Sequence, residues 1–369
     1  MSRIITSRRR LLQTAGATGG LLAAPALIRP RRARAAGVVN VWTYDGFVPE
    51  AFKEQFEADT GIEVRIRLVD DQGKEFNLMA AEAPDLSADI VTVAGHRFRQ
   101  FIDSDLIEPV AEDQLANWAN INPIYTDSDW IVINDAKWGV PILMGSEGLS
   151  YNTDHVSAEE AASWAVMFDQ KYQGKTAYIV QDFMSITLLY LGYDGNMIAY
   201  IDDRDAAAAA VDHTRDFMIE HKDMVRKYYD SGAEVQQMFI NEDIVLGQSW
   251  SGPAAKLIMD GFPLRYTIPK EGSFAFVYTL NVAKNATNRD NAYTFLNALL
   301  AEPGIGTAMT QSTGFVSTLS GAEKGLSDLE QTASSLPQEE LERLVFFRAD
   351  NNEMKYDLID RAVEEVKAA

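Results

Sequence analysis

The sequence predicts an α/β fold of two lobes, and three observations support this class. Short β-rich segments alternate with amphipathic helices over residues 38–93, and a second alternating series runs over residues 176–300. Such alternation is typical of a mainly parallel sheet with helices on its faces. No stretch rich in Ser, Gly or Pro resembles a flexible linker. We therefore expect strands to join the lobes, with a cleft between them.

The first series begins with a β-rich segment at residues 38–42. Residues 49–58 carry apolar side chains at helical spacing, with Pro49 in the first turn, where proline is tolerated. Apolar and charged residues then alternate over 62–68, as in a half-exposed strand. A short apolar strand at 88–93 completes the β-α-β-α-β pattern.

The second series is longer and ends in a polar tail. We expect strands at residues 176–180, 243–249, 264–268 and 274–283, and helices at 183–191, 205–222, 253–260 and 290–300. The tail over residues 337–367 is predicted to be helical throughout.

Residues 1–35 have the composition of an export signal. They hold eight arginines and no acidic residue, and residues 7–12 (SRRRLL) form a twin-arginine pattern. A Gly- and Ala-rich apolar run follows, and residues 33–35 (ARA) fit a cleavage site. We expect a twin-arginine signal peptide that is removed, so that a folded protein reaches the periplasm. A permanent anchor is the alternative, although Pro25 and three glycines make the run weakly hydrophobic.

Charge and composition exclude several classes of partner and site. The chain has 33 basic and 54 acidic residues, and removal of residues 1–35 leaves 25 basic residues and a net charge of −29. A surface this acidic repels nucleic acid and anionic lipid headgroups. The chain has no cysteine, which excludes disulfides, thiolate metal sites and a cysteine nucleophile.

No sequence motif indicates catalysis or metal binding. The four histidines lack metal-ligand spacing, and residues 247–251 (GQSWS) lack the final glycine of a nucleophile elbow. We expect no enzyme activity, no metal and no cofactor. An exported hydrolase that uses two facing carboxylates is the alternative, because acidic residues are numerous and none is singled out.

Aromatic residues at predicted strand ends are the most informative candidates for a binding site. An open parallel sheet presents its ligand crevice at the carboxyl ends of its strands. The candidates at such ends, or two apart on one face of a strand, are Trp42, Thr43, Tyr44, Trp250, Phe276 and Tyr278. Core packing is the alternative for each of these aromatic residues taken singly.

Segments along the whole chain after residue 35 match a known family in the right order. They are 40–44 (NVWTY), 139–141 (GVP), 151–152 (YN), 163–165 (SWA), 168–175 (FDQKYQGK), 191–193 (LGY), 247–252 (GQSWSG), 269–272 (PKEG), 288–292 (NRDNA) and 295–296 (FL). With these segments the chain resembles the periplasmic substrate-binding proteins of ABC importers, most closely the spermidine/putrescine-binding branch.

The resemblance implies a type II periplasmic binding protein fold. Each lobe is a central mixed sheet flanked by helices, and crossing strands form the hinge. The N-terminal lobe would comprise residues 36–148 and 279–314, and the C-terminal lobe residues 149–278 and 315–369. The resemblance also implies a monomeric receptor that encloses a small ligand and delivers it to a permease with its ATPase subunits. A sensor that presents its ligand to a membrane receptor is a further alternative.

The resemblance also gives roles to individual residues. Residues 42–44 match the first-lobe ligand segment, Trp250 a second-lobe aromatic and Phe276 an aromatic of the hinge strand. Asp182 lies near the position of a family carboxylate that binds an amine.

Other positions depart from the family pattern. Tyr278 replaces an aspartate of polyamine binders, His96 lies in a loop that replaces a Ser- and Tyr-bearing one, and Glu147 replaces a small residue. Arg348 lies near a polar pocket residue of relatives. Glu147 could supply the lost acid, with a solvated hinge residue as the alternative.

These residues predict a small cationic or zwitterionic amine as the ligand. A buried ammonium group needs a carboxylate partner, and aromatic faces add cation–π attraction. Loss of the hinge aspartate makes spermidine a poor fit and favours a mono-amine or quaternary ammonium. Arg348, if it reaches the pocket, would favour a ligand with an anionic group as well.

Overall fold

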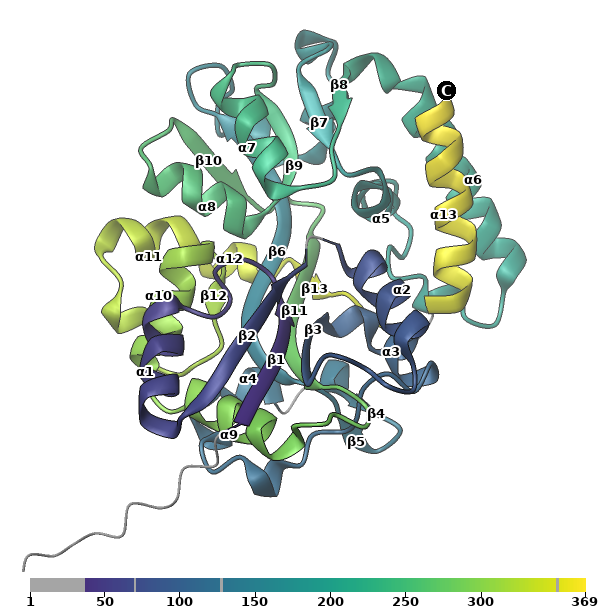
Figure 1. The fold of residues 1–369 in the computed structure, drawn as a ribbon. Coiled ribbons are helices and arrows are strands. Elements are labelled where there is room, and N and C mark those ends of the chain that lie inside the picture. The colour runs from purple at the N-terminus through teal and green to yellow at the C-terminus, as the bar shows by residue number, and fades with distance from the viewer. Residues whose placement is uncertain (1–36, 70, 127–128, 350–351) are drawn as a thin grey trace, which may run out of the picture. The chain divides into compact units, whose positions relative to one another are not determined.

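The computed structural model describes residues 37–369 apart from residue 70, residues 127–128 and residues 350–351. The predicted signal peptide, residues 1–35, lies outside the described residues. The described residues belong to one compact unit (Figure 1). None of their helices combines the length and the low polarity that crossing a membrane requires.

The strands fall into a large mixed sheet and a small hairpin (Figure 1). They are β1 (Gly37–Thr43), β2 (Ile62–Leu68), β3 (Ile90–Ala94), β4 (Val132–Ile133), β5 (Ala136–Lys137), β6 (Val140–Asn152), β7 (Thr176–Tyr178), β8 (Val225–Tyr228), β9 (Leu246–Trp250), β10 (Leu264–Thr267), β11 (Ser273–Val282), β12 (Val316–Ser317) and β13 (Leu344–Phe346).

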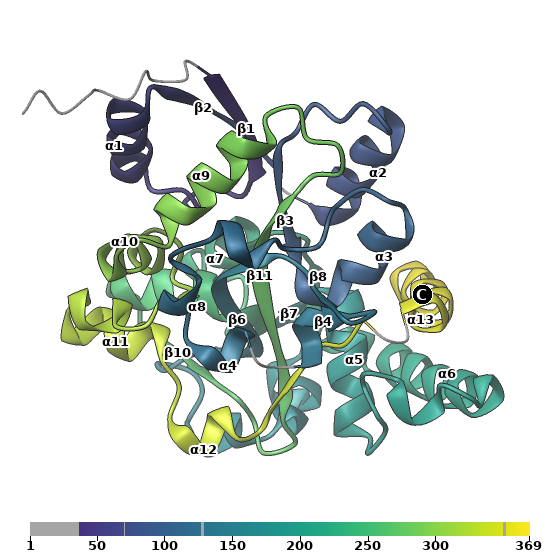
Figure 2. The ribbon, with the colours of Figure 1, turned by 90° about the horizontal axis from the view of Figure 1, so that it is seen from below.

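The helices flank these strands on both sides (Figures 1 and 2). They are α1 (Glu50–Thr60), α2 (Gln72–Glu82), α3 (Phe98–Asp103), α4 (Pro123–Thr126), α5 (Val180–Tyr190), α6 (Arg204–Glu220), α7 (Gly232–Ile240), α8 (Ser251–Met259), α9 (Arg289–Leu299), α10 (Pro303–Thr313), α11 (Asp328–Ser334), α12 (Gln338–Leu341) and α13 (Asn352–Ala368).

The large sheet has the strand order β2-β1-β3-β11-β6-β9-β7-β8. Strand β1 is parallel to β2 and β3, and β7 is parallel to β8 and β9. Strand β11 is antiparallel to both β3 and β6, and β6 is antiparallel to β9. The sheet is therefore mixed, and the expectation of a mainly parallel sheet is wrong around β6 and β11.

Strand β6 belongs to two groups of strands. Its first half pairs with β11 up to Ser146, and its second half pairs with β9 from Glu147 onward. One group contains β2, β1, β3, β11 and β13, and the other contains β9, β7, β8 and β10. Figure 1 shows β6 running from the lower group into the upper one. The predicted lobe boundaries stay a prediction, because residues 35–369 form a single unit by their contacts.

Local sequence signals explain most element boundaries. Gly61 takes a left-handed conformation (φ 75°) that ends α1, and its N–H donates to Glu57. Strand β2 alternates buried and exposed residues at the sheet edge, whereas β3 is buried along its whole length. The tail differs from prediction: residues 344–346 form β13, which pairs with Ser273–Ala275 of β11. A neighbouring strand edge thus overrides the helical pattern there.

The apolar faces of the helices cover the sheet. Helix α9 packs on β1 and β11, α1 packs on β2, and α7 and α8 pack on β9. Helix α13 lies against α5 and α6, which Figure 2 shows as a group beside the strands. Helix α5 also contacts β11, so it lies between α13 and the sheet.

Candidate ligand-binding site

Glu147 is a buried carboxylate at the point where β6 passes from one strand group to the other. Its side chain accepts hydrogen bonds from Trp250 Nε1 at 2.9 Å and from Gln248 Nε2. Glu147 pairs with Trp250 across the ladder, and Gln248 lies two residues back on the same face of β9. The register of two strands therefore fixes both donors against this carboxylate.

Asp182 lies in the first turn of α5 and joins Glu147 through a hydrogen bond between their carboxyl groups. Burial raises the pKa of both groups, and the charge of Asp182 raises the pKa of Glu147 further. Arg97 opposes the rise in the pKa of Asp182. Glu147 is buried and Asp182 is half-buried. Two carboxyl groups in contact resist ionising together, so a shared proton is favoured when no cation is present.

A cluster of aromatic rings lies around Tyr278. Its ring centroid is 5.0 Å from that of Phe47, 5.2 Å from Phe276, and 5.6 Å from both Tyr44 and Phe315. Tyr278 also feels the charges of Glu147 and Asp182, which together with burial raise its pKa. The aromatic rings and the acid pair are therefore neighbours, and we call them together the acid–aromatic cluster.

The chain path explains why these rings meet. Tyr44 and Phe47 follow the carboxyl end of β1, and Tyr278 pairs with Ala94, the last residue of β3. The carboxyl ends of neighbouring parallel strands lie at one edge of a sheet, where α/β folds bind ligands. Tyr44 directly follows β1 and Trp250 ends β9, as the sequence predicted, whereas Phe276 and Tyr278 lie within β11. The sequence did not single out Phe47.

Two predicted residues on β1 are not brought to the cluster. Trp42 is 3% exposed, and the guanidinium of Arg67 lies 4.5 Å from its ring centroid, because the two residues pair in register. Thr43 is 1% exposed, and its hydroxyl accepts a hydrogen bond from Thr92 Oγ1 at 2.8 Å. Both side chains are engaged in packing of the sheet.

His96 and Arg348 are placed beside the cluster rather than in it. The His96 ring lies 5.2 Å from that of Phe347, and burial with the nearby Arg97 and Lys355 lowers its pKa. The imidazole is therefore neutral at pH 7. The backbone N–H of Arg348 donates to Asn196 Oδ1 at 3.1 Å.

Three charged residues near the cluster escaped the sequence prediction. Arg97 follows His96 in the loop that departs from the family pattern, so this departure was the available signal. Lys355 on α13 is 8% exposed, and burial lowers its pKa to about 8. Glu75 on α2 is 2% exposed, and burial raises its pKa to about 9. Sequence pattern gives no signal for the last two, since both lie on ordinary polar helices.

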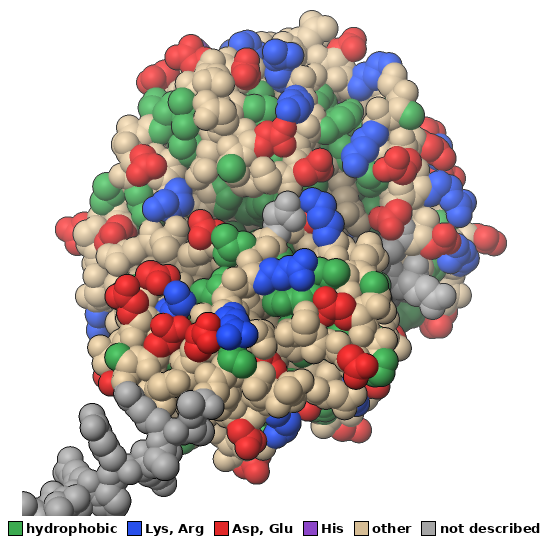
Figure 3. Space-filling model, in the orientation of Figure 1, with side chains coloured by type: hydrophobic (Ala, Val, Ile, Leu, Met, Phe, Trp, Pro, Cys, Tyr) green, Lys and Arg blue, Asp and Glu red, His purple; other side chains and the backbone are tan. Residues whose placement is uncertain are grey.

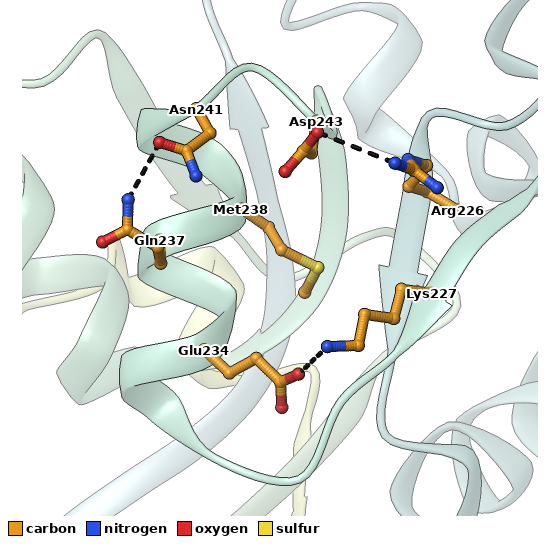
Figure 4. A pocket seen from close by; sticks show the side chains of 7 residues that line it. All are labelled: Arg226, Lys227, Glu234, Gln237, Met238, Asn241 and Asp243. Carbon is orange, nitrogen blue, oxygen red and sulfur yellow. Dashed lines mark hydrogen bonds and ion pairs between the residues drawn. The ribbon is translucent and has the colours of Figure 1, made fainter.

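The aromatic cluster rings Phe47, Phe276 and Phe315 are buried, and two hollows in the described surface lie elsewhere. One, of about 250 Å³, lies between β8, α7 and the loop that follows α7, where Glu234 pairs with Lys227 and Asp243 with Arg226 (Figure 4). The other, of about 300 Å³, lies between the start of α5 and α13. Neither is lined by Glu147, Asp182 or Tyr278.

The acids do not form a metal centre within the part of the chain that the structure describes. No group of three or more His, Asp or Glu side chains there is arranged to hold a metal ion. The surface of the visible face carries acidic and basic side chains interspersed (Figure 3).

Residues 51–335 match the family of bacterial extracellular solute-binding proteins. The chain belongs to this family. It is 24% identical over 312 residues to the spermidine/putrescine-binding periplasmic protein of Escherichia coli (strain K12), which covers 83% of this chain and 86% of that protein.

Solved structures show the same fold. A putative spermidine/putrescine ABC transporter protein from Listeria monocytogenes matches with a TM-score of 0.77 at 21% identity, over 89% of this chain and 98% of that chain. The binding protein MotA from A. tumefaciens B6, in complex with glucopine, matches with a TM-score of 0.68 at 16% identity, over 89% and 98%.

These findings confirm three predictions from the sequence. The fold is that of periplasmic binding proteins, and the chain is a distant member of the spermidine/putrescine-binding branch. The protein is a periplasmic or extracellular solute-binding receptor of an ABC importer, and its family is not catalytic. The alternative of a hydrolase is thereby set aside.

Proposed function

We propose that the protein captures a small cationic or zwitterionic amine in the acid–aromatic cluster and delivers it to a membrane permease. The observation that carries the proposal is the contact between the carboxyl group of the buried Glu147 and that of the half-buried Asp182. In the empty protein a shared proton offsets the repulsion between them. A bound ammonium group replaces that proton and is itself paired, which a buried cation requires.

The aromatic rings support a cationic ligand group. Tyr44, Tyr278 and Trp250 are half-buried, so each keeps part of its surface accessible to a ligand. A cation over an aromatic face gains about 0.5–2 kcal/mol when it is desolvated. The indole N–H of Trp250 also holds Glu147 in place at 2.9 Å. This combination selects a cation with apolar substituents over a fully hydrated metal ion.

Arg97 would pair with the anionic group of a zwitterionic ligand. Its charge lowers the pKa of both Asp182 and Tyr278, so it faces the same cluster. A ligand carboxylate near Arg97 would form a charge-assisted hydrogen bond, which is stronger than a neutral one. Arg97 takes the role that the sequence suggested for Arg348.

The proposed ligand contacts come from both strand groups, so binding would favour closure of one group onto the other. Asp182 and Trp250 belong to elements of the strand group around β9, whereas Tyr44 and Tyr278 belong to the group around β1 and β11. A ligand that contacts both shifts an open–closed equilibrium toward the closed form by its differential affinity. The strand group around β1 and β11 and the strand group around β9 would rotate relative to each other about β6.

Export by the twin-arginine route belongs to the same proposal. The pattern at residues 7–12 would direct a folded, monomeric protein of residues 36–369 to the periplasm. Replacing Arg8 and Arg9 by lysine would retain the precursor in the cytoplasm. Periplasmic precursor-free protein in that variant would contradict the route and leave the ligand proposal unaffected.

The test is a thermal-shift screen of residues 36–369. The panel contains diamines, mono-amines, glycine betaine, amino acids, a neutral sugar and an organophosphonate. A ligand that binds only the folded protein raises its melting temperature by mass action. We expect amines to raise it and the neutral sugar and phosphonate to leave it unchanged. A rise with the sugar or phosphonate alone would overturn the proposal.

A further inference from the structure

Lys355 on α13 is a buried cation without a counter-charge among the described residues. Its side chain is 8% exposed, and within the described chain no hydrogen bond or ion pair holds its ammonium group. The ammonium nitrogen lies 4.7 Å from the ring centroid of Phe347 and 5.9 Å from that of Phe274, two rings that stack at 4.2 Å. Aromatic faces attract a cation, but they do not replace the counter-charge that a buried ammonium needs.

The acids around Lys355 are already engaged with other groups. Asp182 and Asp194 are the carboxylates whose charges act on Lys355. Asp194 accepts hydrogen bonds at 2.9 and 2.7 Å from two backbone N–H groups of its own loop. Asp182 is in contact with the carboxyl group of Glu147. Neither acid forms an ion pair with Lys355 in the part of the chain that the structure describes.

The register of β11 puts Lys355 on the face of the sheet that carries the acid–aromatic cluster. Phe274, Phe276 and Tyr278 alternate along β11, so their side chains share one face. The backbone N–H of Phe347 donates at 2.9 Å to the β11 carbonyl between Phe274 and Phe276, which fixes Phe347 beside this strand. Two residues of a strand span about 7 Å, so the rings under Lys355 are the immediate neighbours of the cluster rings.

Glu147 reaches the same position from β6. Ser146 pairs with Ala275 of β11. Glu147 is the next residue and comes level with Phe274, at the point where β6 begins to pair with β9. Opposite residues of an antiparallel pair point to the same face of a sheet. The carboxylate of Glu147 and the ammonium of Lys355 therefore lie on one face beside the same residue, and no ion pair between described residues joins them.

We propose that Lys355 binds a carboxylate group of the ligand whose ammonium group is held by Glu147 and Asp182. The inference rests on the proposed function and narrows its ligand class to amino acids and related amino carboxylates. Lys355 joins Arg97, which would pair with the same anionic group. It is a specificity-determining residue, because a second ammonium group at this end would meet a like charge, whereas a carboxylate would satisfy the buried lysine.

The test compares wild type with Lys355→Met and with Lys324→Met, which changes an exposed lysine, by isothermal titration calorimetry. Methionine is unbranched and apolar, so it keeps the contact with the two rings while the charge is removed. The ligands are amino acids of two to six carbons with a terminal amine, and the 1-aminoalkanes of the same length. We expect Lys355→Met to weaken the best amino acid about tenfold or more and to leave the matching aminoalkane no weaker. Lys324→Met should behave as wild type.

The methyl ester of the best amino acid provides a second measurement on the wild type alone. It keeps the ammonium group and the chain but carries no negative charge, so it should bind about tenfold more weakly or worse. Unchanged amino acid affinity in Lys355→Met, equal losses for both ligand types, or an ester as tight as the acid would overturn the inference. Amine binding would then leave the proposed function standing, whereas no binding of any amine or amino acid to wild type would end both.

Discussion

The side chains of Glu147 and Glu75 are equally buried, but they differ in the hydrogen bonds that their carboxyl groups make. Glu147 accepts hydrogen bonds from two side chains that strand register holds in place, whereas Glu75 has no hydrogen-bond partner within the described chain. Both carboxyl groups are 2% exposed. Hydrogen bonds offset the cost of burial for the first and not for the second. The comparison teaches that hydrogen bonds hold the carboxyl group of Glu147 in place, whereas the carboxyl group of Glu75 lacks such donors.

Removing the acid pair of Glu147 and Asp182 should have the largest effect. The double variant Glu147→Gln with Asp182→Asn leaves a bound ammonium without a counter-charge, and breaking a buried pair in this way costs about 3–5 kcal/mol. We therefore expect amine affinity to fall by about 100-fold or more in calorimetry. The circular dichroism spectrum should be unchanged, because the amides replace two groups that share a proton. Wild-type affinity in the double variant would remove the acid pair from the site.

The indole N–H of Trp250 tests whether preorganisation itself matters. Trp250→Phe keeps an aromatic face but leaves Glu147 without the hydrogen bond at 2.9 Å. A hydrogen bond to a charged group contributes about 1.5–3 kcal/mol, so we expect amine affinity to fall about tenfold. Trp250→Ala should bind more weakly still, since it also loses the ring. If the Phe variant matches wild type, the hydrogen bond does not position the carboxylate for binding.

Glu75 should make the free energy of unfolding depend on pH. Burial raises the pKa of Glu75 to about 9 in the folded protein, above its value of about 4.5 in the unfolded chain. The folded state therefore holds a proton that the unfolded state has lost, and this contribution to stability falls as pH rises between these values. From pH 6 to 7 the wild type should lose up to about 1.4 kcal/mol that Glu75→Gln does not lose.

Chemical denaturation of both proteins at the two pH values measures this difference. His96 and the acid pair also titrate differently in the two states, but they are common to both proteins and cancel in the comparison. Parallel stability profiles would show that Glu75 is ionised or exposed in solution.

Arg97 gives the smallest expected effect and separates amines from zwitterions. Its positive charge acts on Asp182 and Tyr278, so it repels a second cation nearby. We expect Arg97→Gln to tighten binding of a pure diamine about threefold, by analogy with other partly screened charge pairs. An amino acid should bind more weakly to this variant. Weaker diamine binding would instead mean that Arg97 positions Asp182.

Much of the fold was predictable because local signals and the hydrophobic pattern agree. The strands at β1, β2 and β3 and helix α1 follow from alternation, helical spacing and Gly61. The tail strand β13 was not predictable, since its three residues become a strand only by pairing with Ser273–Ala275. Neither segment alone carries a sequence pattern that indicates pairing between segments so distant in the chain.

The site was predictable where chemistry coincides with strand ends. Tyr44 and Trp250 stand at such ends, and Glu147 and Asp182 were suggested by their place in the family pattern, so these candidates stay a prediction that the structure brings together. Glu75 and Lys355 were missed because polar residues on amphipathic helices are ordinarily solvated. Only the packing of α2 on β3 and of α13 on α5 puts them into the interior.

Strand β6 changes partners between two consecutive residues, Ser146 and Glu147. The carboxylate proposed to bind the ligand thus stands next to the peptide link about which one strand group would turn relative to the other. Ligand binding at Glu147 would therefore act directly on the backbone dihedral angles at residues 146 and 147, with no further side chains between the ligand and the hinge. Amide hydrogen exchange at these two positions should therefore report the open and closed states of the receptor as directly as any attached probe.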